Sequence, residues 1–146
     1  MAALFSGVGV ALVTLFDDDC NLDAPATADL AARLVDLGVR AVLVAGTTGE
    51  AATLTPEERR AVVGAVRAAI PTNVPVLAGS GAPTGRQAAE LTERVFDAGA
   101  DAALVLSPPG VADPRAYYDR VAKAAAARPL LAYHFPTASS PGIPVR

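Results

Sequence analysis

A short run of glycines and hydroxyl side chains, Gly46-Thr47-Thr48-Gly49-Glu50, has the residue types needed to bind an anion. Its two glycines let the backbone approach a ligand closely. Two hydroxyl groups and successive backbone N–H groups can together hold a carboxylate or a phosphate. The alternative is an ordinary glycine-rich turn in which the threonine hydroxyls bond only the local backbone. We expect the Glu50 carboxylate to bond loop N–H groups rather than to act as a general base.

Tyr133 is the second candidate, in the segment Tyr133-His134-Phe135-Pro136 that ends an apolar run. A tyrosine at the carboxyl end of a buried strand can place its hydroxyl in a site and relay protons. The alternative is a core tyrosine whose hydroxyl meets a backbone partner. Because successive strand residues point to opposite sides, we expect His134, the only histidine, to pack against a helix.

A second glycine-rich loop, Gly79–Gly85, carries a weaker signal. Pro83 and the glycine spacing break the dinucleotide fingerprint G-x-G-x-x-G, and the sequence contains no G-x-x-x-x-G-K-[ST] phosphate loop. The pair Gly7 and Gly9 precedes an apolar run, whereas the fingerprint follows one. We therefore do not expect a nucleotide-binding site.

Five short apolar runs supply the strands that would position these loops. Their hydrophobic residues are continuous rather than alternating, which is typical of strands buried on both faces. The predicted strands are Val8–Thr14, Ala41–Ala45, Val74–Ala78, Ala102–Leu106 and Leu130–Tyr133. The two candidate segments follow the second strand and end the fifth.

Four helical patterns lie between the strands. Their start and stop signals are a leucine face with a closing glycine, a capping box with proline in the first turn, a second threonine cap, and an Asp-Pro start. They occur at Asp29–Gly38, at Thr55–Glu58, at Thr84–Gln87 and at Asp113-Pro114. This alternation predicts βαβ units and an α/β fold with a parallel sheet, in which sites lie beyond the carboxyl ends of the strands.

The segment Leu34–Gly46 is similar to Val95–Ser107, which begins 61 residues later. That offset equals two βα units of about thirty residues each. Repetition of one unit favours a (β/α) barrel over a doubly wound sheet without deciding between them. A closed eight-stranded barrel typically needs about 250 residues. The 146 residues therefore form either an open flavodoxin-like sheet of five strands or an incomplete barrel of about five strands and four helices.

Composition restricts the class of protein. Hydrophobic residues make up 52% of the chain and charged residues 18%, with a mean hydropathy of +0.37. We expect one domain over residues 1–146 with a buried core and no disorder. No apolar run approaches the roughly 20 residues of a membrane-spanning helix. No basic segment precedes the apolar start, so we expect a soluble, cytoplasmic protein without a membrane partner.

Charge and cysteine content exclude further classes. The net charge is −3 and the isoelectric point about 5.0, with no run of Lys and Arg, so nucleic acid is not an expected partner. Cys20 is the only cysteine, which excludes an internal disulfide. One cysteine and one histidine argue against a zinc site. We expect no metal and no cofactor.

Five segments, taken in order, resemble the dihydrodipicolinate synthase/N-acetylneuraminate lyase family of class I, pyruvate-handling (β/α)8 enzymes. They are Gly9–Phe16, Gly46–Glu50, Leu54–Glu58, Val76–Gly81 and Tyr133–Pro136. The resemblance extends over Gly7–Pro136 and implies the first five strands of an eight-stranded TIM barrel.

The resemblance also implies a chemistry. Family members form a Schiff base between a lysine and the ketone of pyruvate or another 2-keto acid. By position, Thr48 and the neighbouring amides, including that of Gly49, would hold the carboxylate. Thr47 would join a hydroxyl relay with Tyr133, which would shuttle the proton during imine formation and carbon–carbon bond making or breaking. A dimer or tetramer of identical chains is expected.

The family's Schiff-base lysine lies on the sixth strand, which corresponds to sequence beyond Arg146. The only lysine in this chain is Lys123, in the fourth predicted helix. Helices form the outer ring of a barrel, so we expect the Lys123 amine to be solvated and far from the site. We expect the chain by itself to be catalytically incomplete. The alternative is a non-catalytic 2-keto-acid-binding or regulatory half-barrel module.

Two further departures concern the second substrate. Ser107–Val111 replaces the family's Tyr-Tyr pair, and we expect Tyr117 and Tyr118, further on, to pack instead. Thr137–Gly142 replaces an Arg-Thr-Gly segment, which weakens the synthase assignment more than the sugar-acid aldolase one. Finally, an open part-barrel would leave two strand edges and apolar surface exposed, so we expect self-association.

Overall fold

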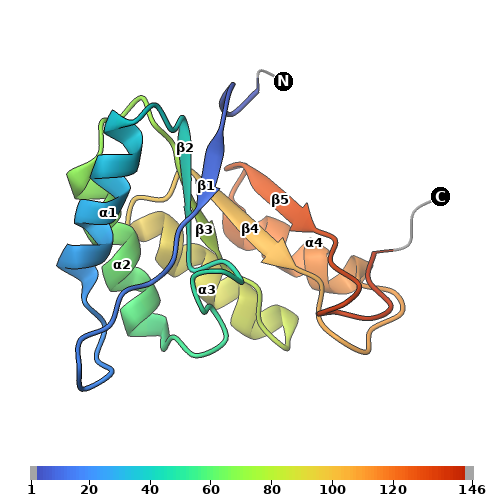
Figure 1. Cartoon of the computed structure of the whole chain (residues 1–146). Coiled ribbons are helices and arrows are strands. Elements are labelled where there is room, and N and C mark those ends of the chain that lie inside the picture. The colour runs from blue at the N-terminus through green and yellow to red at the C-terminus, as the bar shows by residue number, and fades with distance from the viewer. Residues whose placement is uncertain (1–2, 144–146) are drawn as a thin grey trace.

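The computed structural model describes residues 3–143, so both ends of the predicted domain, residues 1–2 and 144–146, lie outside the described residues. Strands and helices alternate along the chain (Figure 1). In order they are β1 (Gly9–Ala11), α1 (Ala24–Asp36), β2 (Ala41–Val44), α2 (Pro56–Ala69), β3 (Val76–Gly79), α3 (Gly85–Asp97), β4 (Ala102–Leu106), α4 (Arg115–Ala125) and β5 (Leu130–Tyr133).

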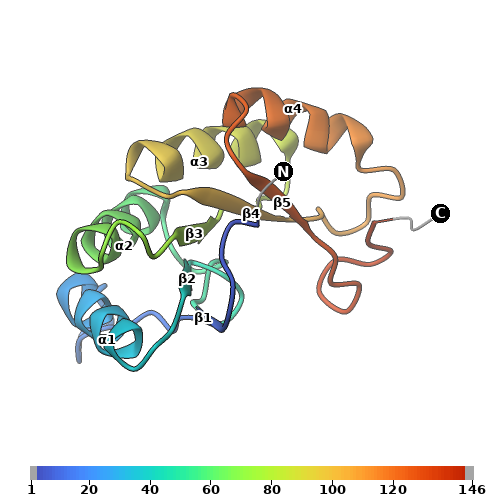
Figure 2. The same cartoon turned by 90° about the horizontal axis from the view of Figure 1, so that it is seen from above.

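The sheet topology decides between the two predicted architectures. All strand pairs are parallel, and the spatial order β1-β2-β3-β4-β5 equals the order along the chain. Figure 2 shows the curved row of strands with the four helices along its outer side. A doubly wound sheet reverses its strand order and carries helices on both faces. The flavodoxin-like alternative is therefore wrong, and the incomplete (β/α) barrel is confirmed.

Helix and strand bounds agree best where the local signals are complete. The bounds of β4 and β5 are as predicted, and Thr55 and Thr84 cap α2 and α3. In contrast, α1 begins five residues before the predicted Asp29. Asp23 caps it by accepting a hydrogen bond from Ala26 N at 2.8 Å. The missed signal is therefore an ordinary aspartate cap.

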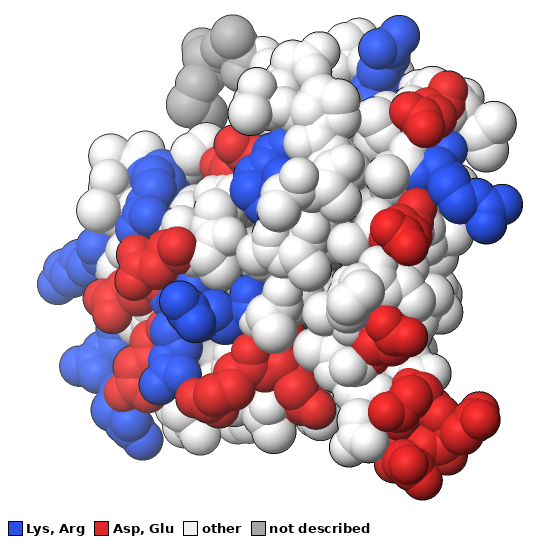
Figure 3. Space-filling model, turned by 90° about the vertical axis from the view of Figure 1, so that its left-hand side faces the viewer, with Lys and Arg blue, Asp and Glu red and all other residues white. Residues whose placement is uncertain are grey.

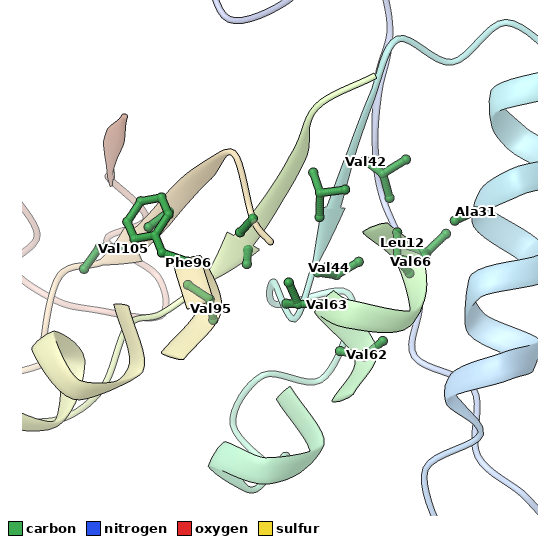
Figure 4. Close-up of a cluster of buried hydrophobic side chains, with 14 of the residues drawn as sticks. Leu12, Ala31, Val42, Val44, Val62, Val63, Val66, Val95, Phe96 and Val105 are labelled. Atoms are coloured by element: carbon green, nitrogen blue, oxygen red, sulfur yellow. The ribbon is translucent and has the colours of Figure 1, made fainter. Parts of the chain in front are cut away.

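The main core lies between the sheet and the helices (Figure 4). Val42 and Val44 of β2 face Val62, Val63 and Val66 of α2, and all five side chains are fully buried. Each such valine stabilises the fold by about 1.5–3 kcal/mol relative to an exposed one. This core holds the strand ends, and with them the loops that follow, in fixed positions.

The prediction that the strands are buried on both faces is confirmed for the central strand β3 and is wrong for the edge strand β5. Every residue of β3 is buried, because β2 and β4 flank it and a small second cluster of Ala41, Leu77 and Ala102 fills the helix-free face. The edge strand β5 is different, since Leu131 keeps 37% of its surface exposed. The predicted exposed edges, at β1 and β5, are confirmed by the strand order.

The surface carries both signs of charge. On the face in Figure 3, Lys and Arg side chains are interspersed with Asp and Glu over much of the area, and a compact acidic group lies at the lower right. None of the helices described here has the length and apolar character needed to cross a bilayer.

Candidate active site at the carboxyl ends of the strands

A cavity of about 440 Å³ opens beyond the carboxyl ends of β2 to β5. Residues from loops far apart in sequence line it, among them Thr47, Gly81, Ser107 and Tyr133. The two predicted catalytic residues, Thr47 and Tyr133, therefore share one cavity although 86 positions separate them in the chain. Thr48 and Gly49 are not among its lining residues.

The Gly46–Glu50 loop is held by its own backbone. Ala51 N donates to Gly46 O at 3.1 Å, and Glu50 N donates to Thr47 O at 3.2 Å. Within residues 3–143, the N–H groups and hydroxyls of Thr47 and Thr48 have no hydrogen-bond acceptor, and both side chains are exposed. The alternative of hydroxyls bonded to the local backbone is therefore wrong for these two threonines. Thr47 lines the cavity, and two successive N–H groups without a protein partner can together receive an anion.

Gly49 packs the loop against the chain segment that follows β1. Its carbonyl accepts a hydrogen bond from the buried Thr14 hydroxyl at 2.7 Å. A Cβ at this position would lie 2.9 Å from Leu12 O and 3.1 Å from Ala45 N, so only glycine fits without a shift of the backbone. Through Gly49 the loop is packed against the chain that follows β1.

Tyr133 ends β5 and is half-buried. Its ring stacks on that of Phe135, with 5.7 Å between the centroids and 20° between the planes. Its hydroxyl has no hydrogen-bond partner among the residues of the described range, Thr47 included. The alternative of a core tyrosine bonded to the backbone is therefore wrong, and the hydroxyl is available to a molecule in the cavity.

Tyr117 and Tyr118 pack as predicted. The Tyr117 hydroxyl donates to Ala82 O at 3.1 Å and accepts from Ala82 N at 3.2 Å. The Tyr118 hydroxyl lies 3.0 Å from both Val105 O and the Ser107 hydroxyl. Burial raises the pKa of both phenols. These two side chains of α4 fix the loops that follow β3 and β4.

Two expectations about polar residues near the site are wrong. His134 directly follows the edge strand β5, is exposed, and accepts a hydrogen bond from Ile143 N at 3.0 Å, so it does not pack against a helix. The Glu50 carboxylate makes no hydrogen bond within the described chain. Glu50 contributes its backbone carbonyl instead, which accepts from Thr53 N and from the Thr53 hydroxyl, both at 2.9 Å.

Lys123 is exposed on α4, in a shallow groove lined by α3 and α4, and it does not line the cavity. The prediction that its amine lies on the outer helical layer is confirmed. Among the described residues, no three His, Cys, Asp or Glu side chains are grouped in a way that could hold a metal ion.

Arg59 lines the cavity and was not singled out from the sequence. It is only 4% exposed, and its guanidinium donates to Gly79 O and Ala51 O, both at 2.6 Å. The available signal was helical spacing: Arg59 lies on the same face of α2 as the buried Val62, Val63 and Val66. A charged residue at a core-facing position points to a special role.

The parallel winding of the five strands and the cavity beyond their ends define part of a (β/α) barrel, a fold that places its sites at the carboxyl face. This chain belongs to the dihydrodipicolinate synthetase family, whose model matches residues 4–145. The family resemblance noted from the sequence motifs is thereby confirmed.

Curated relatives agree with this membership. An uncharacterised DapA-like lyase of Halobacterium salinarum is 44% identical over 136 residues, covering 90% of this chain and 44% of the relative. A 4-hydroxy-tetrahydrodipicolinate synthase of Parasynechococcus marenigrum is 39% identical over 136 residues, covering 90% of this chain and 45% of the relative. The chain thus spans slightly less than half the length of these relatives.

Solved structures of the same family have a similar fold at lower sequence identity. YagE of E. coli K12, a prophage protein of the dihydrodipicolinic acid synthase family solved in complex with pyruvate, is 34% identical with a TM-score of 0.83, covering 92% of this chain and 46% of that one. Dihydrodipicolinate synthase DapA-2 of Bacillus anthracis is 30% identical with a TM-score of 0.85, covering 94% and 48%.

Proposed function

We propose that this chain forms the amino-terminal part of the barrel of a class I lyase or synthase that acts on pyruvate or another 2-keto acid. The observation that carries the proposal is the shared cavity of Thr47 and Tyr133, in a family member similar to a protein solved with pyruvate. The proposal includes a cytoplasmic location and a dimer or tetramer of identical chains.

In this proposal the Gly46–Glu50 loop binds the carboxylate of the keto acid. The N–H groups of Thr47 and Thr48, which have no acceptor within residues 3–143, supply the hydrogen bonds, and Gly49 keeps the loop packed against Leu12 and Ala45. Holding the carboxylate orients the ketone toward the attacking amine, which replaces a random encounter with a fixed geometry.

Tyr133 and Thr47 move the proton in this proposal. The Tyr133 hydroxyl, free of protein partners in the described range, donates to and accepts from the reacting oxygen as the ketone becomes an imine. The protonated imine then withdraws electrons while the carbon–carbon bond forms or breaks. The lysine comes from sequence outside this chain, because Lys123 is exposed on the outer face of α4.

The loops that would bind the second substrate distinguish two classes of enzyme, a synthase and a sugar-acid aldolase. Ser107–Val111 and Thr137–Gly142 offer neither a tyrosine pair nor an arginine for the carboxylate of an aldehyde substrate. This favours a sugar-acid aldolase over a synthase. A non-catalytic keto-acid-binding or regulatory half-barrel module is the second candidate, since Thr47 and Tyr133 line the cavity whereas Lys123, the only lysine of the given sequence, does not.

Borohydride trapping tests both candidates. The protein purified from its source cells is incubated with pyruvate, reduced with borohydride, and measured by intact mass. A longer species carrying a trapped adduct supports the class I enzyme. A species of 14.7 kDa that binds pyruvate without an adduct supports the module. Absence of both adduct and binding contradicts both. Lys123→Arg is the control, since an adduct that disappears in this variant lies on α4 rather than in the cavity.

A further inference from the structure

Arg59 is a buried charge placed where two structural elements of the site meet. One nitrogen of its guanidinium bonds Gly79 O, at the end of β3. The other terminal nitrogen bonds Ala51 O, immediately after the Gly46–Glu50 loop. A single side chain therefore ties the proposed carboxylate loop to the neighbouring strand end.

Within residues 3–143, no carboxylate lies within ion-pair distance of the Arg59 guanidinium. None of the ion pairs in the described part of the chain involves Arg59, and its buried Nε has no hydrogen-bond partner there. Burial lowers the pKa of the guanidinium, but an arginine stays protonated in proteins. An unpaired buried cation makes the cavity that it lines attractive to an anion.

Arg67, on the same helix, also has a buried Nε without a hydrogen-bond partner in the described chain, but it differs from Arg59 in having a carboxylate beside its charge. Its guanidinium bonds three backbone carbonyls, one of them Val74 O at 3.1 Å, and its Nη1 lies 3.0 Å from the Asp101 carboxylate. This group lies at the amino end of β3, away from the cavity. Asp101 therefore neutralises Arg67 near the amino end of β3. In the described chain no carboxylate pairs in this way with Arg59 at the cavity.

We propose that Arg59 is a positioning residue of the keto-acid site. It fixes the Gly46–Glu50 loop against the end of β3, and its unpaired charge draws the substrate carboxylate into the cavity. This inference rests on the proposed function, because it presupposes that the cavity receives a 2-keto acid.

Calorimetric titration of the 146-residue chain with pyruvate and with pyruvamide, its neutral analogue, tests the charge. In Arg59→Met we expect the preference for pyruvate over pyruvamide to fall about tenfold, as for the loss of one charged interaction. Arg59→Lys keeps the charge and should restore the preference. Arg67→Met is the matched control: it should lower stability and leave the preference unchanged.

Hydrogen exchange of the Glu50 and Ala51 amides tests the positioning without any ligand. These amides should exchange faster in Arg59→Lys and Arg59→Met than in the wild type. In Arg67→Met their exchange rates should be unchanged. If Arg59→Met does not fold, Arg59→Lys carries this measurement, and unchanged exchange in it overturns the positioning role.

The failures are distinguishable. A wild-type chain that does not bind pyruvate overturns the proposed keto-acid site and the substrate-attracting role of Arg59 with it. A wild-type chain that binds pyruvate, together with an Arg59→Met variant of unchanged preference, overturns the inference alone.

Discussion

Gly79, at the end of β3, lies against the carbonyl oxygen of Ala45, which directly follows β2, so closely that a Cβ at position 79 would overlap that oxygen. Ala45 itself has a left-handed backbone, with φ at +48°. Its carbonyl is therefore turned by a conformation that few non-glycine residues adopt. The contact brings the loops that follow β2 and β3 together at the cavity.

Gly79→Ala should destabilise the chain by more than about 2 kcal/mol, because the backbone of β2 or β3 must move to make room. Urea unfolding followed by circular dichroism measures the change. Gly64→Ala is the control inside α2, where the nearest atom, Ala98 O, lies 3.9 Å from the new Cβ. That variant should be more stable by about 0.5–1 kcal/mol, as expected for Gly to Ala inside a helix. Equal effects at both positions would contradict the close contact.

Tyr133→Phe and Tyr117→Phe should separate binding from stability. Removing the Tyr117 hydroxyl leaves the backbone groups of Ala82 without their partner and should cost about 1–3 kcal/mol. Removing the Tyr133 hydroxyl breaks no hydrogen bond in the described chain, so stability should change by less than about 0.5 kcal/mol. Pyruvate affinity, measured by titration, should fall several-fold only in Tyr133→Phe. Unchanged affinity in that variant would remove Tyr133 from the site.

Glu58 should make stability depend on pH. Hydrogen bonds from the backbone and hydroxyl of Thr55 lower the pKa of this carboxyl below its ordinary value of 4.5. The folded state therefore binds fewer protons than the unfolded state, and the stabilisation is present above pH 4.5 and lost as the pH falls through the folded-state pKa. In Glu58→Gln that loss should disappear from urea unfolding curves recorded between pH 3 and pH 6. Glu93→Gln, whose carboxylate makes no hydrogen bond in the described chain, should keep it.

The open edges should make the purified chain self-associate. Leu131 of the edge strand β5 is 37% exposed in the sheet, and Leu131→Lys should reduce association. Leu37, which is 83% exposed at the end of α1, is the control position, and Leu37→Lys should leave association unchanged. Sedimentation velocity at several concentrations measures both. A wild-type chain that stays monomeric at every concentration would contradict this prediction.

The sequence predicted those parts of the molecule in which local and tertiary signals coincide. The continuous apolar run of β4 and the capping box at Thr55 are examples, since each is favoured locally and also packs in the fold. The pairing order of the strands was not predictable, because repeats of βα units are compatible with both a barrel and an open sheet. The expectation for His134 is wrong because strand alternation predicts the side to which a side chain points, but not whether a helix packs on that side.

The residues that carry the hydroxyl groups of the candidate site could be predicted from the sequence. The buried arginine that holds the loop in place could not. The Gly46–Glu50 loop and Tyr133 stand out by residue type and by their place after strands. Arg59 lies twenty positions before its acceptor Gly79, and no local pattern links the two. The role of Arg59 follows only from the position of the end of β3 in the folded chain, which cannot be predicted from the residues around Arg59.

The strand order also describes how the chain can assemble during synthesis. Each new strand pairs only with the strand made just before it, and each helix packs beside its predecessor. A nascent chain can therefore add one βα unit at a time, without waiting for a distant partner to leave the ribosome. At every stage the last strand offers an unpaired edge to the next one, so the growing sheet serves as a template for its own extension.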